Sequence, residues 1–113
     1  MEVYMITVAE TGAFRDQVES LLSEDEKIDL ITYLSLNPGA GVLVQGTGGI
    51  RKLRWAGFGR GKSGGIRVLY YFHSEKMPLY LLATFGKNER TNISMKEARL
   101  LASLVKQLKR YWS

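Results

Sequence analysis

Hydrophobic residues recur along this chain in two different periods, which divide it into strands and helices. Alternating or continuous apolar runs predict strands at 3–8, 50–56, 66–72 and 79–85. The last of these runs is apolar on both faces, which is typical of a strand inside a sheet. Apolar residues spaced three or four positions apart predict three helices, with inward faces made of Phe14, Val18 and Leu21, of Ile28, Ile31 and Leu34, and of Ala98, Leu101, Val105, Leu108 and Trp112.

Polar residues mark where the helices begin and end. Capping signals precede all three helices: Thr11 for the first, Ser23 with Glu26 for the second, and Ser94 with Glu97 for the third. The tripeptide at 37–39, Asn-Pro-Gly, ends the second helix, and a glycine-rich loop follows at 39–49. The predicted class is therefore α+β, with a mostly antiparallel sheet of about four strands, an N-terminal helical hairpin and a C-terminal helix, in one domain over 1–113.

Composition narrows the kinds of site that the chain can hold. It has 113 residues, 45% of them hydrophobic, and no cysteine. The lack of cysteine excludes a disulfide scaffold, a thiolate metal site and a cysteine nucleophile. Residues 1–8 carry Glu2 and no long apolar run, so no signal peptide is expected. Because no stretch approaches the roughly 20 apolar residues of a membrane span, we expect a cytoplasmic protein without a membrane partner.

Charge is distributed unevenly along the chain. The net charge is +5, but residues 1–29 hold eight acids and two bases, while residues 30–113 hold three acids and fourteen bases. No acid occurs between Leu30 and Ser74. Such a field favours a polyanion partner such as RNA or DNA. The alternative is a solvated basic face that binds no ligand.

The basic residues concentrate in one stretch, 48–72, which reads GGIRKLRWAGFGRGKSGGIRVLYYF. Alternation along the first strand of this stretch places Lys52 and Arg54 on one face and Arg51 on the other. The glycine-rich segment at 57–65, which contains Arg60 and Lys62, is predicted to be a mobile tip between two antiparallel strands.

Arg67 lies in the middle of the second of these strands. It shares a face with Leu69 and Tyr71, whereas the core set of that strand, Ile66, Val68 and Phe72, occupies the other face. An arginine there needs a partner, which is either a bound anion or a group such as the Glu89 carboxylate or helix C-terminal carbonyls.

Several kinds of active site are excluded by spacing. The segment GRGKS at 59–63 resembles the end of a phosphate-binding loop, but Ala56 occupies the required glycine position and a strand follows in place of a helix. The single histidine, His73, has no acid–base partner or metal cluster in the sequence, so no metal or cofactor is expected. No pair of carboxylates lies near the basic strands, which excludes glycosidase and two-metal nuclease sites. Most aromatic residues are expected in the core, and Tyr71 is the best candidate to stack on a base.

Catalysis by cations remains compatible with these residues. RNA cleaves itself when its 2′-hydroxyl attacks the adjacent phosphate in line. A protein accelerates this reaction by holding the phosphate and neutralising the charge of the transition state. Arginine suits phosphate oxygens, and a lysine crowded by other cations has a lowered proton affinity and could take a proton.

Three blocks of the sequence resemble a known family. GTGGIRKLRW, GRGKSGGIRVLYYF and LYLLATFGKNE, within residues 46–93, are similar to the RelE/ParE superfamily of bacterial toxins, with the closest likeness to the HigB-type branch. The resemblance implies a RelE-like microbial ribonuclease fold and an mRNA interferase that cleaves mRNA in the ribosomal A site. It also implies a cognate antitoxin, which is usually a helix-turn-helix DNA-binding protein. The toxin would then contact operator DNA only through this antitoxin.

The resemblance assigns site residues by motif. The expected catalytic residues are Lys52, Arg54, Arg67 and Lys87. The expected RNA- and ribosome-binding residues are Arg51, Arg60, Lys62, Tyr71, Asn88 and Arg90. Asn88 stands where RelE has an arginine, and Ser94 falls near the position of a RelE tyrosine that stacks on substrate. The proton donor and acceptor therefore stay open.

Two other functions stay open as well. One is a non-catalytic, basic nucleic-acid-binding module of the same fold, and the other is a phage protein with an unrelated role. The acidic N-terminal helices are either a solvated face or a surface for the antitoxin.

Overall fold

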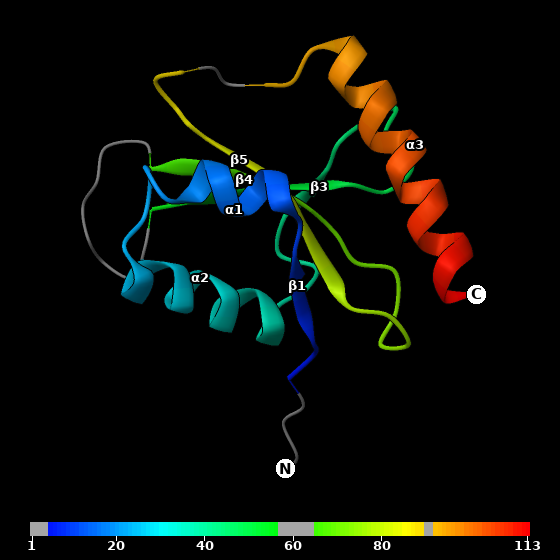
Figure 1. Ribbon diagram of the computed structural model, residues 1–113, viewed down its shortest axis with the longest axis horizontal. Helices are drawn as coiled ribbons and strands as arrows, with labels where there is room; N and C mark the ends of the chain where they lie inside the picture. The colour runs from blue at the N-terminus through cyan, green and yellow to red at the C-terminus, as the bar shows by residue number, and fades with distance from the viewer. Residues whose placement is uncertain (1–4, 57–64, 90–91) are drawn as a thin grey trace.

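The structure, a computed structural model, describes residues 5–56, 65–89 and 92–113. Within these ranges five strands form one sheet in the spatial order β1-β5-β4-β3-β2 (Figure 1). The strands are β1 Val8–Glu10, β2 Val42–Leu43, β3 Arg51–Trp55, β4 Ile66–Tyr71 and β5 Leu79–Gly86. Only β1 and β5 run parallel, and the other neighbouring pairs are antiparallel. The predicted α+β class and mostly antiparallel sheet are confirmed.

In the described ranges, three helices cover the two faces of this sheet. They are α1 Gly12–Val18, α2 Glu24–Leu36 and α3 Met95–Trp112, and α2 and α3 lie on opposite sides of the molecule (Figure 1). Side chains of α1 and α2 pack on one face, in a core with Trp55, Val68 and Tyr70. Val105 of α3 packs on the other face, in a second core with Leu69. Because both faces are covered, all six residues of β4 are buried.

The predicted capping residues hold the helices in place. The Thr11 hydroxyl accepts a hydrogen bond from Phe14 N and donates one to Leu81 O at 2.9 Å, which ties the start of α1 to β5. Both capping boxes form: Ser23 with Glu26 at α2, and Ser94 with Glu97 at α3. Local sequence therefore determines where these helices begin.

Three details differ from the sequence-based prediction. The first strand occupies 8–10, because its position is set by parallel pairing with β5. Of the predicted range 3–8, residues 3 and 4 lie outside the described residues, and residues 5–7 are not in a strand. A fifth strand, β2, forms within the segment predicted to be a loop, where Val42 and Leu43 pair with β3. In α2 the side chain of Ile28 is 55% exposed and Leu30 is buried in its place. The helix presents a different set of apolar residues to the sheet than spacing alone indicated.

Candidate nucleic-acid interface and cleavage site

The sheet brings three of the predicted catalytic cations together on one face. In the register of β3 and β4, Arg54 lies directly opposite Arg67, and Lys52 lies opposite Leu69. Residues directly opposite in an antiparallel pair have Cα atoms about 4.5–5.5 Å apart and side chains on the same face. Like charges placed this way repel one another. Together with Lys87 these residues are called the cationic face below.

Arg67 is the most buried member of the cationic face, with 7% of its surface exposed. Its Nη1 donates to Ile66 O at 3.4 Å, and its own carbonyl accepts from Thr84 Oγ1 at 2.8 Å. The Glu89 carboxylate, which the sequence offered as a possible partner, accepts a hydrogen bond from Gly86 N. Lys52 is partly exposed, whereas Arg54 and Lys87 are exposed, so burial differs sharply among the four cations.

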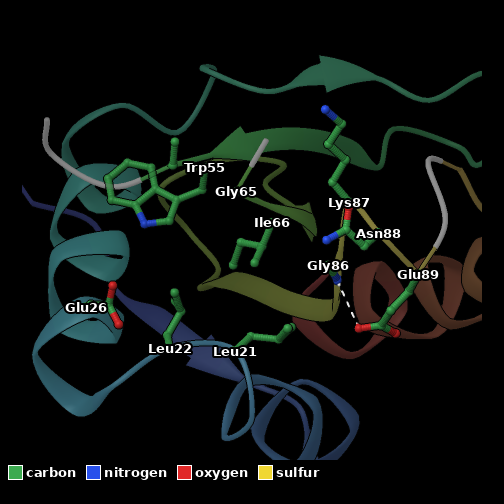
Figure 2. Close-up of a pocket in the computed structure, with 11 residues that line it drawn as sticks. Leu21, Leu22, Glu26, Trp55, Gly65, Ile66, Gly86, Lys87, Asn88 and Glu89 are labelled. Atoms are coloured by element: carbon green, nitrogen blue, oxygen red, sulfur yellow. Dashed lines mark hydrogen bonds between the residues drawn. The ribbon is translucent and has the colours of Figure 1, made fainter. Parts of the chain in front are cut away.

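Lys87 stands on a turn that follows β5. Glu89 closes this turn twice: its N–H donates to Gly86 O at 3.0 Å, and its carboxylate accepts from Gly86 N at 3.1 Å. Lys87 N donates to Gly65 O at 3.4 Å, which attaches the turn to the start of β4. Figure 2 shows the Lys87 side chain pointing away from Leu21. Lys87 directly follows the last residue of β5, the strand in which Phe85 lies opposite Arg67.

Arg51 faces the other way and has a structural partner. Its Nη1 donates to Gly41 O at 2.8 Å and to Gly39 O at 3.4 Å. Tyr70 braces the same loop, because its hydroxyl donates to Pro38 O and accepts from Gly41 N, both at 2.8 Å. Burial raises the pKa of Tyr70, and the Gly41 hydrogen bond and the Arg51 charge oppose this shift. The guanidinium of Arg51 therefore holds the loop that leads into β2, and its assignment to RNA binding stays a prediction.

Tyr71 lies buried on the Arg67 side of the sheet. Its side chain is 3% exposed and packs in the core beneath α3 with Leu69 and Met77. Its ring lies parallel to that of His73, with centroids 6.4 Å apart, and burial raises the pKa of the phenol. A ring buried in this way exposes little surface to a nucleobase, and the assignment of Tyr71 to base stacking stays a prediction. Alternation placed Tyr71 on the correct face, but it could not show that α3 covers that face.

The chain was also compared with families of known proteins. Residues 43–112 match the family model of the RelE toxin of the RelE / RelB toxin-antitoxin system. The chain belongs to the RelE toxin family. The match includes every residue of the cationic face, together with β3, β4, β5 and α3. Family membership, predicted from the motifs, is thereby confirmed, and it implies an antitoxin partner.

The remaining predicted residues of this toxin are placed only in part. Asn88 lies exposed on the turn next to Lys87. Arg60, Lys62 and Arg90 lie outside the described residues, so their assignment to RNA binding stays a prediction. Among the residues that the structure describes, no cluster of three or more potential metal ligands occurs, and no helix is long and apolar enough to cross a membrane.

A pocket adjoins the toxin's Lys87 turn, and sequence reasoning did not anticipate it. Its volume is about 310 Å³. Its apolar walls include Leu21, Leu22, Trp55 and Ile66, and its polar lining includes Glu26, Lys87, Asn88 and Glu89 (Figure 2). These residues come from four separate segments between 21 and 89. No local pattern could identify a site assembled from segments so far apart in the sequence.

Proposed function

We propose that this RelE-family toxin is a ribosome-dependent endoribonuclease that cleaves mRNA in the ribosomal A site. The observation that supports the proposal is the cross-strand pair Arg54–Arg67 on the cationic face, with Lys52 two residues from Arg54. Like charges directly opposite each other destabilise a sheet, and a bound anion would offset this repulsion. The RNA phosphate is the anion that the family membership suggests.

The reaction requires charge stabilisation at the scissile phosphate. The 2′-oxygen forms a bond to phosphorus, the bond to the 5′-oxygen breaks, and the products are a 2′,3′-cyclic phosphate and a 5′-hydroxyl end. Arg67 is suited to stabilise the transition state, because its guanidinium donates two parallel hydrogen bonds and is largely shielded from water. Lys87, held by its turn, supplies a second positive charge.

The reaction also needs two proton transfers, for which the more exposed Lys52 and Arg54 are the candidates. One proton leaves the 2′-hydroxyl and one reaches the departing 5′-oxygen. Lys52 and Arg54, which lie on the same side of β3, position the phosphate. A lysine is able to accept the proton of the 2′-hydroxyl, whereas an arginine stays charged and acts only as a donor toward the departing oxygen. The step consumes no oxidant or reductant, and these four side chains supply its charge stabilisation without a metal ion.

The proposal includes the partners of the toxin. The ribosome presents the mRNA, and Arg60, Lys62, Asn88 and Arg90 contact RNA. A cognate antitoxin, a helix-turn-helix protein of the kind paired with HigB-type toxins, neutralises the toxin in the cytoplasm and carries it to operator DNA. Residues 1–113 act as one toxin domain.

Primer extension on a translated reporter mRNA tests this function. The wild type, Arg67→Ala and Arg54→Ala are each induced briefly, beside Arg15→Ala as a matched control. Arg15 is an exposed arginine on α1, which packs on the opposite face of the sheet. We expect cuts within translated codons for the wild type and Arg15→Ala. We expect a loss of at least about a hundredfold for Arg67→Ala, because a charge-stabilising donor is removed.

Two controls make the outcome decisive. Circular dichroism and sedimentation with ribosomes check that Arg67→Ala is folded and still binds. Cuts that persist in folded Arg67→Ala would contradict the assignment of this residue. An absence of cuts with the wild type, together with ribosome binding, would contradict the nuclease and favour a non-catalytic binding module.

A further inference from the structure

The pocket beside the Lys87 turn has the size and the lining of a site that can bind one side chain of a partner. Leu21 and Leu22 follow α1, Trp55 ends β3 and Ile66 begins β4, so four apolar side chains meet around a volume of about 310 Å³ (Figure 2). Transfer of a leucine-sized side chain from water into such an environment is favourable by about 1.5–3 kcal/mol. The pocket is therefore suited to anchor one bulky apolar side chain.

Two carboxylates in the pocket lining determine the charge of a suitable partner. Glu26 Oε1 accepts from Ser23 N at 3.0 Å, and Glu89 Oε1 accepts from Gly86 N at 3.1 Å, so both carboxylates are held in place. Outside the pocket lining, the first turn of α2 also carries Asp25 and Glu24, of which Glu24 Oε1 lies 3.8 Å from Lys27 Nζ. This negative field repels RNA phosphates and attracts lysine and arginine.

The lysine of the pocket lining does not reverse this charge preference. Lys87 belongs to the turn, but its side chain points away from the leucines of the pocket (Figure 2). Its ammonium group therefore lies at the edge of the pocket remote from Leu21 and Leu22. The two carboxylates outnumber this one positive charge in the pocket lining.

We infer that this pocket is a docking site for the antitoxin, which inserts one bulky apolar side chain flanked by lysine or arginine. The inference rests on the toxin–antitoxin part of the proposed function and is independent of mRNA cleavage. An antitoxin segment anchored there lies against the turn that carries Lys87. It would therefore obstruct the approach of RNA to the cationic face from its edge.

Nuclear magnetic resonance titration of the full chain tests this inference with defined peptides. The probe is the capped peptide Gly-Lys-Arg-Leu-Arg-Lys-Gly, and the control peptide has serine in place of leucine. The chain has two tryptophans, so the Trp55 indole reports the pocket and the Trp112 indole, in α3, is an internal reference. We expect the leucine peptide to shift the signals of Trp55, Gly86 and Lys87, and to bind at least about tenfold more tightly than the serine peptide.

A matched pair of double variants isolates the role of the two pocket carboxylates. Glu26→Gln with Glu89→Gln removes two charges, while the glutamine oxygens can still accept the hydrogen bonds from Ser23 N and Gly86 N. Asp16→Asn with Glu19→Gln removes two exposed charges at α1. We expect the first pair to weaken binding of the leucine peptide about fivefold, and the second to leave it within about twofold.

Three results would overturn the inference. The first is unchanged Trp55 and Gly86 signals, which would place the peptide elsewhere. The second is equal affinity for the leucine and serine peptides, which would show attraction by charge alone. The third is an equal response to uridine monophosphate, which would show a nucleotide pocket. Because none of these readouts involves cleavage, failure of the nuclease proposal is recognised separately by primer extension.

Discussion

Two glycines beside the site obey different constraints. Gly65 adopts a φ of +54°, and a Cβ added there would clash with the carbonyl oxygen of Trp55. Gly86 has no such φ, and its added Cβ would lie 3.5 Å from Glu89 Oε1 and 3.6 Å from Leu21 Cδ2, which are ordinary contacts. Only the first position requires glycine, because backbone atoms, which cannot move aside, surround it.

These two positions give a paired stability prediction. Gly65→Ala should lower the free energy of unfolding by about 2 kcal/mol or more, from the strained φ and the clash with the Trp55 carbonyl. Gly86→Ala should change it by less than about 1 kcal/mol. Urea denaturation followed by far-ultraviolet circular dichroism measures both. Equal losses for the two variants would contradict the backbone geometry at Gly65.

At the scale of elements, the position of β2 depends on hydrogen bonds from side chains of β3 and β4 to the loop before it. β2 contains only two residues, and both of its side chains are exposed. The loop before it is held by Arg51 and Tyr70, whose polar atoms bond to Pro38, Gly39 and Gly41. A strand this short has little stability of its own, so we attribute its position largely to these contacts.

Replacing Tyr70 tests how much its two hydrogen bonds contribute to the stability of the fold and of β2. Tyr70→Phe should lower the free energy of unfolding by about 1–3 kcal/mol, because Pro38 O and Gly41 N both lose a hydrogen-bond partner. The β2 amides should lose protection from hydrogen exchange before those of β4. Tyr111→Phe is the matched control, since Tyr111 is exposed at the end of α3.

Tyr70 also makes the free energy of unfolding depend on pH in the alkaline range. Burial raises the pKa of Tyr70 in the folded state above its ordinary value of 10.0, so the folded chain retains the proton longer than the unfolded chain. This contribution is fully present below pH 10 and is lost as the pH rises through the folded-state pKa. Tyr71 is shifted in the same direction. The urea midpoint should therefore fall above pH 10, and less steeply in Tyr70→Phe than in Tyr111→Phe.

At the scale of the whole molecule, the charges are separated between the two sides of the sheet. The first turn of α2 carries Glu24, Asp25 and Glu26. On the other side, α3 carries five bases and one acid: Lys96, Arg99, Lys106, Lys109 and Arg110 against Glu97. The basic side also includes Lys52, Arg54 and Arg67, and its positive field favours a polyanion.

The salt dependence of ribosome binding measures how many of these cations contact phosphate groups of RNA. Lys52→Gln and Arg54→Gln should each reduce the slope of log affinity against log salt by roughly 0.7–0.9. Arg15→Gln, on the acidic side, should leave the slope unchanged. Fluorescence titration between low and physiological salt provides the measurement. If all three variants changed this slope equally, ribosome binding would depend on the net charge of the protein and not on the cationic face.

The sequence by itself determined the elements and the chemical character of the site. Periodicity and capping residues placed α2, α3, β3, β4 and β5 to within one or two residues, because these signals act over a single turn or between alternate residues of one strand. Spaced motifs identified the family and selected Lys52, Arg54, Arg67 and Lys87. Alternation alone put Lys52 and Arg54 on one face.

Only the tertiary structure decided which element covers each face. It buried Tyr71 beneath α3, turned Arg51 toward the loop before β2, and paired β1 with β5, about seventy residues away. It also assembled the pocket from four segments of the chain. A sequence pattern specifies the face on which a side chain lies but not what packs against it. That partner is set by contacts between distant segments, whose free energy depends on the whole fold.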